Sequence, residues 1–351
     1  MNDNASISNG TSGGGGTVIA IGVAGVFCFA SVVVSAYLIL RHFKHWVEPQ
    51  AQAHIVRILL MVPVYAIASW LSLLLAQHTL YFNLARDCYE AYVLYQFFAL
   101  LVHYFDAAQG ADMDAGRGDT ATADYLERLP ARYHPFPCCC LPPIRPGAQF
   151  LLATKRCILQ YVLVKPAAAL LAATLQLAGL YEEGGTRLDR AYVWLTLVVN
   201  VSVSLSLYYL VLFYDTIAHV IEPSLNEQYQ DEDQEDQEDV GERYNTPLYK
   251  LITIKLLLFF VFWQSLAIDA LYYFKVMPAF LSVGSNNKHD ILNNALVCAE
   301  MFLLAVANLW VYPYGGYRDG TNTLGQCWSN CWNRVVKQRD LIDDTKEVFL
   351  L

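Results

Sequence analysis

Residues 17–40 read TVIAIGVAGVFCFASVVVSAYLIL, an apolar stretch without a charged side chain. It exceeds the roughly 20 residues that an α-helix needs to cross a hydrocarbon core about 30 Å thick. No basic segment precedes it, and it is too long for the apolar core of a signal peptide, so we expect it to remain in the protein as a membrane span. The stretch therefore places at least this part of the chain in an apolar solvent.

The rest of the chain has the same apolar character. Of its 351 residues, 56% are hydrophobic and 16% are charged, whereas a soluble domain is typically about 45–50% apolar and about 25% charged. The apolar residues occur in blocks that leave no stretch able to bury a separate core, which excludes a soluble enzyme. We expect an all-α polytopic membrane protein with seven transmembrane helices, at about 17–40, 58–77, 90–107, 157–180, 191–214, 252–274 and 291–312.

The distribution of Lys and Arg predicts how these spans are oriented. Five of the 23 basic residues fall in one alternate set of connections, and sixteen fall in the other set, 41–57, 106–156, 215–250 and 313–351. The positive-inside rule then places the N-terminus outside or in the lumen and the C-terminus in the cytosol. This organisation predicts a disordered luminal tail over 1–16, a seven-helix domain over 17–312 and a cytosolic tail over 313–351.

The cytosolic connection 106–156 carries a cysteine triplet. Its Pro-rich stretch YHPFPCCCLPPIRP excludes a helix through Cys138, Cys139 and Cys140. Cysteines beside a membrane are candidates for S-palmitoylation. An unmodified linker is the main alternative, and a zinc site is disfavoured because the triplet lacks the usual ligand spacing.

Charge and glycosylation signals bear on the partners. The formal net charge is −9, but seven acidic residues lie within 231–239 of the connection 215–250. That run should be disordered, and the remainder of the chain is near neutral, so we expect no nucleic-acid partner.

Asn4 begins an Asn-Ala-Ser sequon in the predicted luminal tail, where glycosylation is possible.

Polar side chains inside spans are the candidates for a transport pathway, because they are costly in lipid and usually face a bundle interior or a cavity. In the fourth span Lys165 lies beside Pro166, which removes a backbone donor and suggests an anion-binding point. A snorkelling lysine or a structural ion pair is the alternative. Further polar groups in spans four to seven are Gln160, Asn200, Asp269 and Asn293.

The seventh span carries its polar residues at helical spacing. Asn293, Glu300 and Asn308 are separated by seven and then eight residues, which brings them near one helical face. Such a stripe suggests either a pathway or polar contacts that hold helices together. We also predict a direct or water-mediated contact between Glu300 and Lys165.

Enzyme chemistry has no support in the sequence. The nucleotide-binding G-x-x-x-x-G-K-[ST], the nucleophile-elbow G-x-S-x-G and the zinc H-E-x-x-H motifs are all missing. His42, His45 and His54 cluster around one connection but lack a matching set at the ends of later spans, which disfavours a membrane zinc hydrolase. We therefore expect no catalytic residue, no cofactor and no metal.

Several longer strings resemble the transmembrane protein 184 and organic solute transporter alpha-subunit family. They are HIVRILLMVPVYAIASWLSLL at 54–74, RDCYEAYVLYQF at 86–97, PFPCCCLPP at 135–143, KRCILQYVLVKP at 155–166, NVSVSLSLYYLVLFY at 200–214, FVFWQSL at 260–266 and CAEMFLLAVA at 298–307. The resemblance covers nearly the whole membrane region, with the spans in the same order. One departure is Ala68, where we expect an acidic residue before SWLSL.

The resemblance implies a seven-span protein with its N-terminus outside and its C-terminus inside. The alpha-subunit branch moves bile acids, steroid conjugates and similar amphipathic organic anions by facilitated diffusion, together with a single-span beta subunit. This sequence is closer to the other branch, which is described only as transporters. By position, the third-span entry motif corresponds to Arg86, Asp87, Cys88, Tyr89 and Glu90. The fourth-span motif corresponds to Gln160, Lys165 and Pro166, and the last-span motif includes Glu300.

The function that follows is facilitative transport of amphipathic organic solutes. The expected partners are membrane lipids, a small organic anion, and either a single-span beta-type subunit or a second copy of the chain. The location is a plasma membrane or an endomembrane. The alternative is a membrane scaffold, trafficking or signalling protein without transport activity, in which the acidic run and the lipidated cysteines would carry the function.

Overall fold

The computed structural model describes residues 12–110, 118–134, 140, 142–177, 191–230, 288–315, 322, 325–326, 329, 335 and 339–349. Within these residues the chain is helical, and extended backbone pairs only in one antiparallel bridge, between Arg132 and Ile144. The all-α class is therefore confirmed for the described part of the chain.

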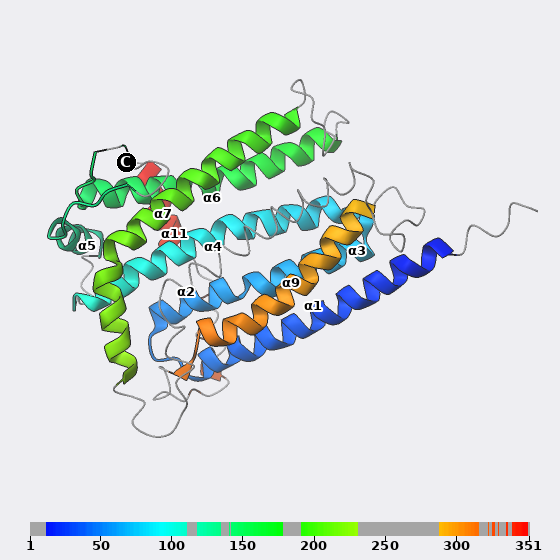
Figure 1. The fold of residues 1–351 in the computed structure, drawn as a ribbon, viewed down its shortest axis with the longest axis horizontal. Helices are drawn as coiled ribbons and strands as arrows, with labels where there is room; N and C mark the ends of the chain where they lie inside the picture. The colour runs from blue at the N-terminus through cyan, green and yellow to red at the C-terminus, as the bar shows by residue number, and fades with distance from the viewer. Residues whose placement is uncertain are drawn as a thin grey trace, which may run out of the picture. The chain divides into compact units, whose positions relative to one another are not determined.

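The described helices follow one another along the chain (Figure 1). They are α1 Ser12–Lys44, α2 Pro49–Leu59, α3 Met61–Leu74, a short 3₁₀ turn η1 Ala76–His78, α4 Thr79–Ala108, α5 Gly118–Glu127, α6 Ala148–Leu177, α7 Ala191–Gln230, α9 Lys288–Val311 and α11 Arg339–Phe349.

Five helical segments are long and apolar enough to cross a membrane. They match the first, second, fourth, fifth and seventh expected spans, and comprise Val18–Lys44, Pro49–Leu74, Ala148–Leu175, Trp194–Ile221 and Ile291–Val311. The expected third span, 90–107, lies in α4, a 30-residue helix that is about 45 Å long at 1.5 Å per residue. The sixth, 252–274, lies outside the described residues. An integral membrane protein is thus established, while the count of seven spans and their orientation stay predictions.

Three helices extend beyond the bounds that we expected. α1 begins at Ser12, within the segment 1–16 expected to be disordered, because adding a turn to an existing helix carries no nucleation cost. α6 begins at Ala148, ahead of 157, and α7 continues to Gln230, into the connection 215–250. Both extensions bury apolar or small side chains, namely Phe150, Leu151, Thr154, Thr216, Ile217 and Ile221.

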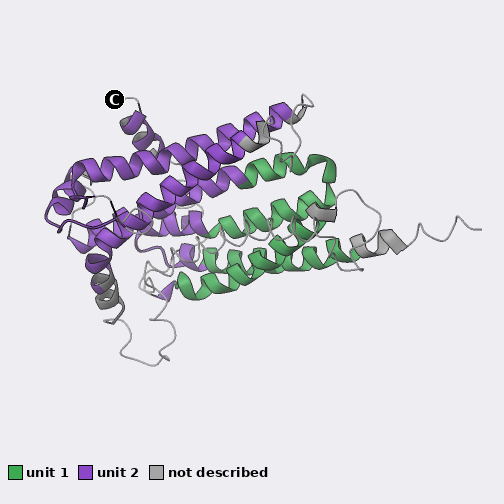
Figure 2. Cartoon of the chain, turned by 45° about the horizontal axis from the view of Figure 1, so that its top comes forward, with its two compact units in different colours: residues 1–40, 59–86, 248–313 green, residues 41–58, 87–247, 314–351 purple. Residues whose placement is uncertain are grey.

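The described helices belong to two compact units, which Figure 2 distinguishes by colour. Unit 1 comprises residues 1–40, 59–86 and 248–313, and unit 2 comprises 41–58, 87–247 and 314–351. Each unit has its own set of helix contacts. Unit 1 holds most of α1 with α3 and α9, and unit 2 holds most of α4 with α5, α6, α7 and α11.

Unit 1 is held together by close packing of its helices. The Phe27 ring of α1 lies 5.9 Å from the Phe302 ring of α9, centroid to centroid. The Trp70 indole of α3 donates to the Ile21 carbonyl of α1 at 3.4 Å. This approach is possible because Gly25 has no side chain: a Cβ there would lie 2.8 Å from Nε1 of Trp70.

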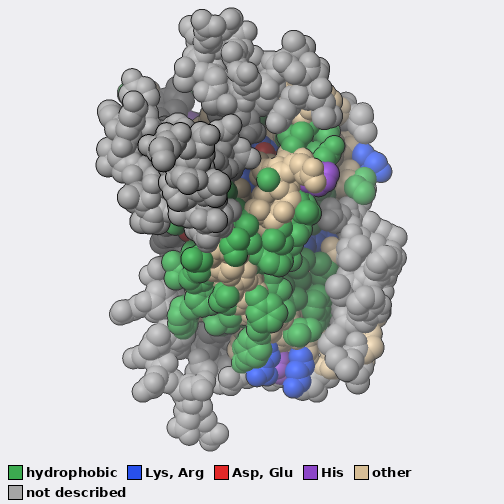
Figure 3. Space-filling view, turned by 90° about the vertical axis from the view of Figure 1, so that its right-hand side faces the viewer, with side chains coloured by type: hydrophobic (Ala, Val, Ile, Leu, Met, Phe, Trp, Pro, Cys, Tyr) green, Lys and Arg blue, Asp and Glu red, His purple; other side chains and the backbone are tan. Residues whose placement is uncertain are grey.

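The outward side of α1 is apolar, as expected for a helix in contact with lipid. Its exposed side chains include Val18, Val26, Phe29 and Leu40, whereas Cys28 is buried. Figure 3 shows hydrophobic side chains gathered on the face that it draws. Apolar patches of this extent are unusual on soluble proteins and fit the lipid phase.

Unit 2 combines an aromatic core with buried polar contacts. The Phe213 ring of α7 packs edge-on against Phe98 of α4, with centroids 5.1 Å apart, and α6 packs along α7 through the Ser206 hydroxyl, which donates to the Cys157 carbonyl. Thr122 of α5 donates to the carboxylate of Asp106 on α4 at 2.8 Å. These contacts fix α4, α5, α6 and α7 within one unit.

A substitution series on α1 tests the packing of unit 1. We expect Gly25→Ala to lower the free energy of unfolding by about 1–3 kcal/mol, because the added methyl group overpacks the contact with the Trp70 ring. Gly22→Ala is the matched control, since a Cβ at Gly22 has nothing within 4 Å. Thermal unfolding in detergent measures both. Equal melting temperatures for the two variants would contradict the described contact.

Candidate functional site

A charged cluster joins α4 to α6 inside unit 2. Asp87 and Glu90 lie three residues apart on α4, and Tyr161 and Lys165 lie four residues apart on α6, so each pair shares one helical face. Nζ of Lys165 lies 3.4 Å from Oδ1 of Asp87 and 3.8 Å from Oε2 of Glu90. The hydroxyl of Tyr161 donates to Oε1 of Glu90 at 2.7 Å. We call these four residues the Lys165 cluster.

The two carboxylates of this cluster are held differently. Glu90 is 16% exposed and receives the short hydrogen bond from Tyr161, whereas Asp87 is 33% exposed. Both ion-pair distances exceed the roughly 2.7–2.9 Å of a charge-assisted hydrogen bond, so the Lys165 ammonium is not tightly bound by either carboxylate. Glu90 is therefore the fixed partner of the lysine and Asp87 the more exchangeable one.

The backbone of α6 is altered next to the lysine. The helix runs through Pro166 without ending. Because Pro166 has no backbone N–H, the Val162 carbonyl loses its usual helical donor. The cation and the altered backbone thus lie on the same turn, as the sequence indicated.

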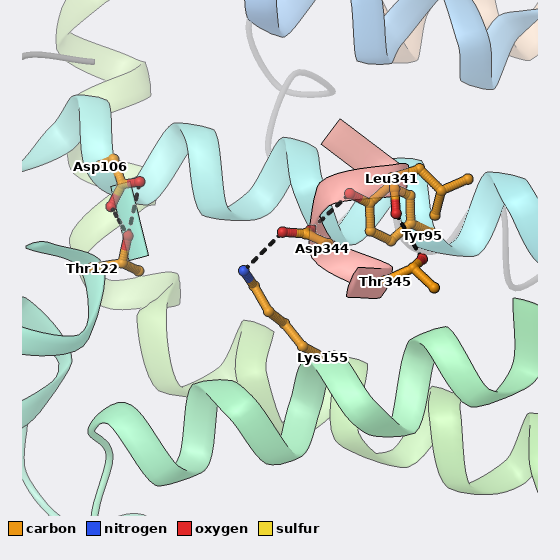
Figure 4. Close-up of polar contacts among 7 residues, drawn as sticks. All are labelled: Tyr95, Asp106, Thr122, Lys155, Leu341, Asp344 and Thr345. Carbon is orange, nitrogen blue, oxygen red and sulfur yellow. Dashed lines mark hydrogen bonds and ion pairs between the residues drawn. The ribbon is translucent and has the colours of Figure 1, made fainter. Parts of the chain in front are cut away.

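A second charged cluster lies on the same helix and includes α11 (Figure 4). Nζ of Lys155 on α6 lies 3.1 Å from Oδ1 of Asp344 on α11. The hydroxyl of Tyr95 on α4 donates to Oδ2 of the same carboxylate at 2.7 Å. Both oxygens of Asp344 are therefore engaged by side chains of two other helices. We call Lys155, Tyr95 and Asp344 the Lys155 cluster.

A buried network surrounds Arg57 in the same unit. Its Nη1 donates to Oε1 of Gln96 at 3.0 Å, and the His54 ring shares that oxygen at 2.7 Å. Nε of Arg57 donates to the Val335 carbonyl at 3.1 Å, and the Tyr89 hydroxyl donates to the Arg57 carbonyl at 2.6 Å. The segment before α11 is thereby attached to α2 by a buried charge-assisted hydrogen bond.

The polar stripe of α9 lies in unit 1. Asn294 and Asn308 are buried, and Asn293 and Glu300 are half-buried. Oε2 of Glu300 is buried and has no hydrogen-bond partner among the described residues. The predicted contact between Glu300 and Lys165 would join the two units and stays a prediction.

The other expected site residues have varied surroundings. Asn200 donates from Nδ2 to the Thr196 carbonyl within its own helix at 2.9 Å, and Gln160 is half-buried on α6. Cys140 is exposed in a turn, and the bridge between Arg132 and Ile144 closes the loop that contains it. Cys138, Cys139, Asp269 and Asn4 lie outside the described residues. In the part of the chain that is described, no three His, Cys, Asp or Glu side chains gather as a metal site.

The sequence analysis places Asp87 and Glu90 together on one motif but misses other members of the two clusters. Tyr161 precedes Lys165 by one helical turn, so helical spacing could have identified it. No local signal links Lys155 to Tyr95 or to Asp344, because these residues are far apart in the chain. Only the tertiary structure brings them together.

Comparison with known proteins supplies independent findings. The sequence profile of the family described as "Organic solute transporter Ostalpha" matches residues 20–224 and 243–317. A curated protein of Dictyostelium discoideum named as a transmembrane protein 184 homolog is 31% identical over 302 residues, which are 86% of this chain and 53% of the relative. The chain therefore spans about half the length of that relative. No solved structure matches the chain.

A double-mutant cycle tests the Lys165 cluster. We expect Lys165→Met to lower the melting temperature, because Asp87 and Glu90 are left near each other without the cation, and Glu90→Gln to restore part of that loss. The coupling free energy should be about 0.5–3 kcal/mol, as is usual for residues in contact.

Tyr161→Phe is the accompanying single variant. It should cost about 1.5–3 kcal/mol, the usual value for a hydrogen bond to a charged group. Thermal unfolding in detergent measures the wild type, the two single variants and the double variant of the cycle, and Tyr161→Phe. Strictly additive effects of Lys165→Met and Glu90→Gln would show that the two side chains do not interact.

Proposed function

The chain belongs to the organic solute transporter Ostalpha family, and we propose from this premise that it moves amphipathic organic anions across a membrane by facilitated diffusion. The anions are molecules with an apolar body and one anionic group, such as steroid conjugates and bile-acid-like compounds. The family supports a transporter role in general; the Lys165 cluster supports the anionic charge, and the steroid and bile-acid class is what the family resemblance implies.

The observation that carries the proposal is a lysine inside an apolar helix with a replaceable counter-ion. Leaving a buried ammonium without a partner costs several kcal/mol, so any rearrangement around Lys165 must keep an anion beside it. An incoming carboxylate or sulfate can take the position of Asp87, the more exposed of the two partners. Glu90 stays in place because Tyr161 holds its other oxygen. Exchange of anions then proceeds without an uncompensated charge.

The exposed leucines of α6 face away from the lysine. Leu163, Leu170 and Leu171 expose their side chains and, at about 100° per residue, lie on the side of the helix opposite Lys165. They fit contact with lipid, and we propose no role for them in binding the anion.

The partners follow from the same reasoning. A single-span beta-type subunit or a second copy of the chain would cover apolar helix surface within the membrane. S-palmitoylation of the cysteine triplet would hold the loop closed by Arg132 and Ile144 against the lipid headgroups, and exposed Cys140 is accessible for it. Polar groups of α9, above all Glu300, are further candidates for the pathway.

The test is uptake of a radiolabelled steroid sulfate into liposomes that contain the purified protein. We expect saturable uptake, and at least about a tenfold lower kcat/KM for Lys165→Gln, which corresponds to about 1.4 kcal/mol of lost interaction. Asp87→Asn should lower KM, because it removes the carboxylate that competes with the substrate. Lys44→Gln is the control, since it removes a lysine that is exposed at the end of α1.

Two outcomes would contradict the proposal. Wild-type uptake by Lys165→Gln would remove the lysine from the binding site. No saturable uptake by a folded protein, with a beta-type partner supplied, would favour the scaffold or trafficking role instead.

A further inference from the structure

We infer that Lys155 and Tyr95 form a second anion site, which the protein fills with Asp344 of its own helix α11, and that a transported organic anion displaces this helix. The inference rests on the proposed function, because it identifies the competing ligand as the same class of molecule. Asp344 of α11 and the transported anion would then compete for the same site at one end of the pathway.

The site has the properties of a binding site for a carboxylate. The Lys155 side chain is 5% exposed and Tyr95 is 1% exposed, so the cation and the phenol are both buried. They engage the two oxygens of Asp344 separately, at 3.1 Å and 2.7 Å. The carboxylate itself is 24% exposed. Its two partners come from α6 and α4, and the anion comes from a helix that follows them far along the chain.

The docking face of α11 resembles an amphipathic anion in its chemistry. Leu341, Asp344, Thr345 and Val348 share one face by their spacing of three and four residues. Val348 is buried, Leu341 is half-buried, and Thr345 donates to the Leu341 carbonyl within the helix. Among the residues drawn in Figure 4, Asp344 is the carboxylate of α11 that contacts Lys155 and Tyr95. A steroid sulfate likewise combines an anionic group with apolar surface.

Release of α11 and binding of an anion are coupled. When α11 leaves, Lys155 loses the carboxylate of Asp344, and an anion that takes this position compensates for the lost ion pair. An anion that binds to Lys155 therefore favours release of α11, and release of α11 favours binding of the anion by the same factor. The attachment of Val335 to Arg57 keeps the segment near the site after release.

The position of this site on α6 links it to the proposed pathway. Lys155 and Lys165 are ten residues apart on one continuous helix, which is about 15 Å at 1.5 Å per residue. An anion that passes from one lysine to the other must meet α11 at Lys155. The helix therefore blocks movement until the anion replaces Asp344.

Hydrogen–deuterium exchange of the backbone amides of 339–349 tests the inference on the full-length protein in phosphatidylcholine nanodiscs. We expect excess estrone sulfate to speed exchange of this helix by at least about tenfold, because undocked helices of this length are marginal in water. Estrone, which has the same steroid body without the charge, should have no effect. Asp344→Asn should exchange fast with or without estrone sulfate.

Asp343→Asn is the matched control, with the same charge change on the neighbouring residue, and it should behave like the wild type. An exchange rate of 339–349 that does not change with estrone sulfate would overturn the inference. Equal exchange rates for Asp343→Asn and Asp344→Asn would also overturn it. Nanodiscs that also contain phosphatidylglycerol form a second arm. Faster exchange there, without any response to estrone sulfate, would identify a lipid phosphate as the competing anion and overturn the role given to the substrate.

The exchange experiment and the uptake experiment can fail separately. If uptake depends on Lys165 but the exchange rate of α11 does not change with estrone sulfate, only the role given to α11 is overturned. A helix α11 that responds to estrone sulfate in a protein without uptake would overturn transport alone.

Discussion

The need to neutralise two lysines on one apolar helix shapes much of unit 2. Lys155 and Lys165 both lie on α6, within a segment apolar enough to cross a membrane. Both ammonium groups are largely buried, with side chains 5% and 16% exposed, so each lysine is stabilised by a counter-ion inside the protein. Asp87 and Glu90 of α4 serve Lys165, and Asp344 of α11 serves Lys155. The helices around α6 are thus positioned by charge as well as by apolar packing.

Both clusters are built from the same three chemical groups. In each, a lysine and a tyrosine hydroxyl contact different oxygens of one carboxylate, Glu90 in the first cluster and Asp344 in the second. The tyrosine supplies a neutral donor, so the carboxylate is satisfied without a second positive charge. The difference lies in the origin of the carboxylate, because α4 is a long helix of the unit whereas α11 is a short amphipathic one. That difference makes the second carboxylate the easier one to exchange.

The sequence predicts the helices better than it predicts the clusters. Apolar length identifies five spans, because each needs only local information. The sequence misplaces the start of α6 at Ala148 and the continuation of α7 beyond 214, because burial of side chains such as Phe150 and Ile217 within unit 2 stabilises these turns and hydropathy does not report it. Lys165 and Glu90 were identified singly, one as an isolated charge in a span and one through the family resemblance. Their pairing, and the docking of Asp344, depend on contacts between distant segments that composition and spacing do not encode.

The length of α7 has an electrostatic consequence. Its apolar segment ends at Ile221, but the helix continues to Gln230, which adds about 13 Å of rise at 1.5 Å per residue. The seven acidic residues within 231–239 follow directly. The acidic run therefore begins beyond the nine helical residues that follow Ile221, about two and a half turns past the apolar segment. Its first carboxylate is thus separated along the chain from the surface that would contact lipid.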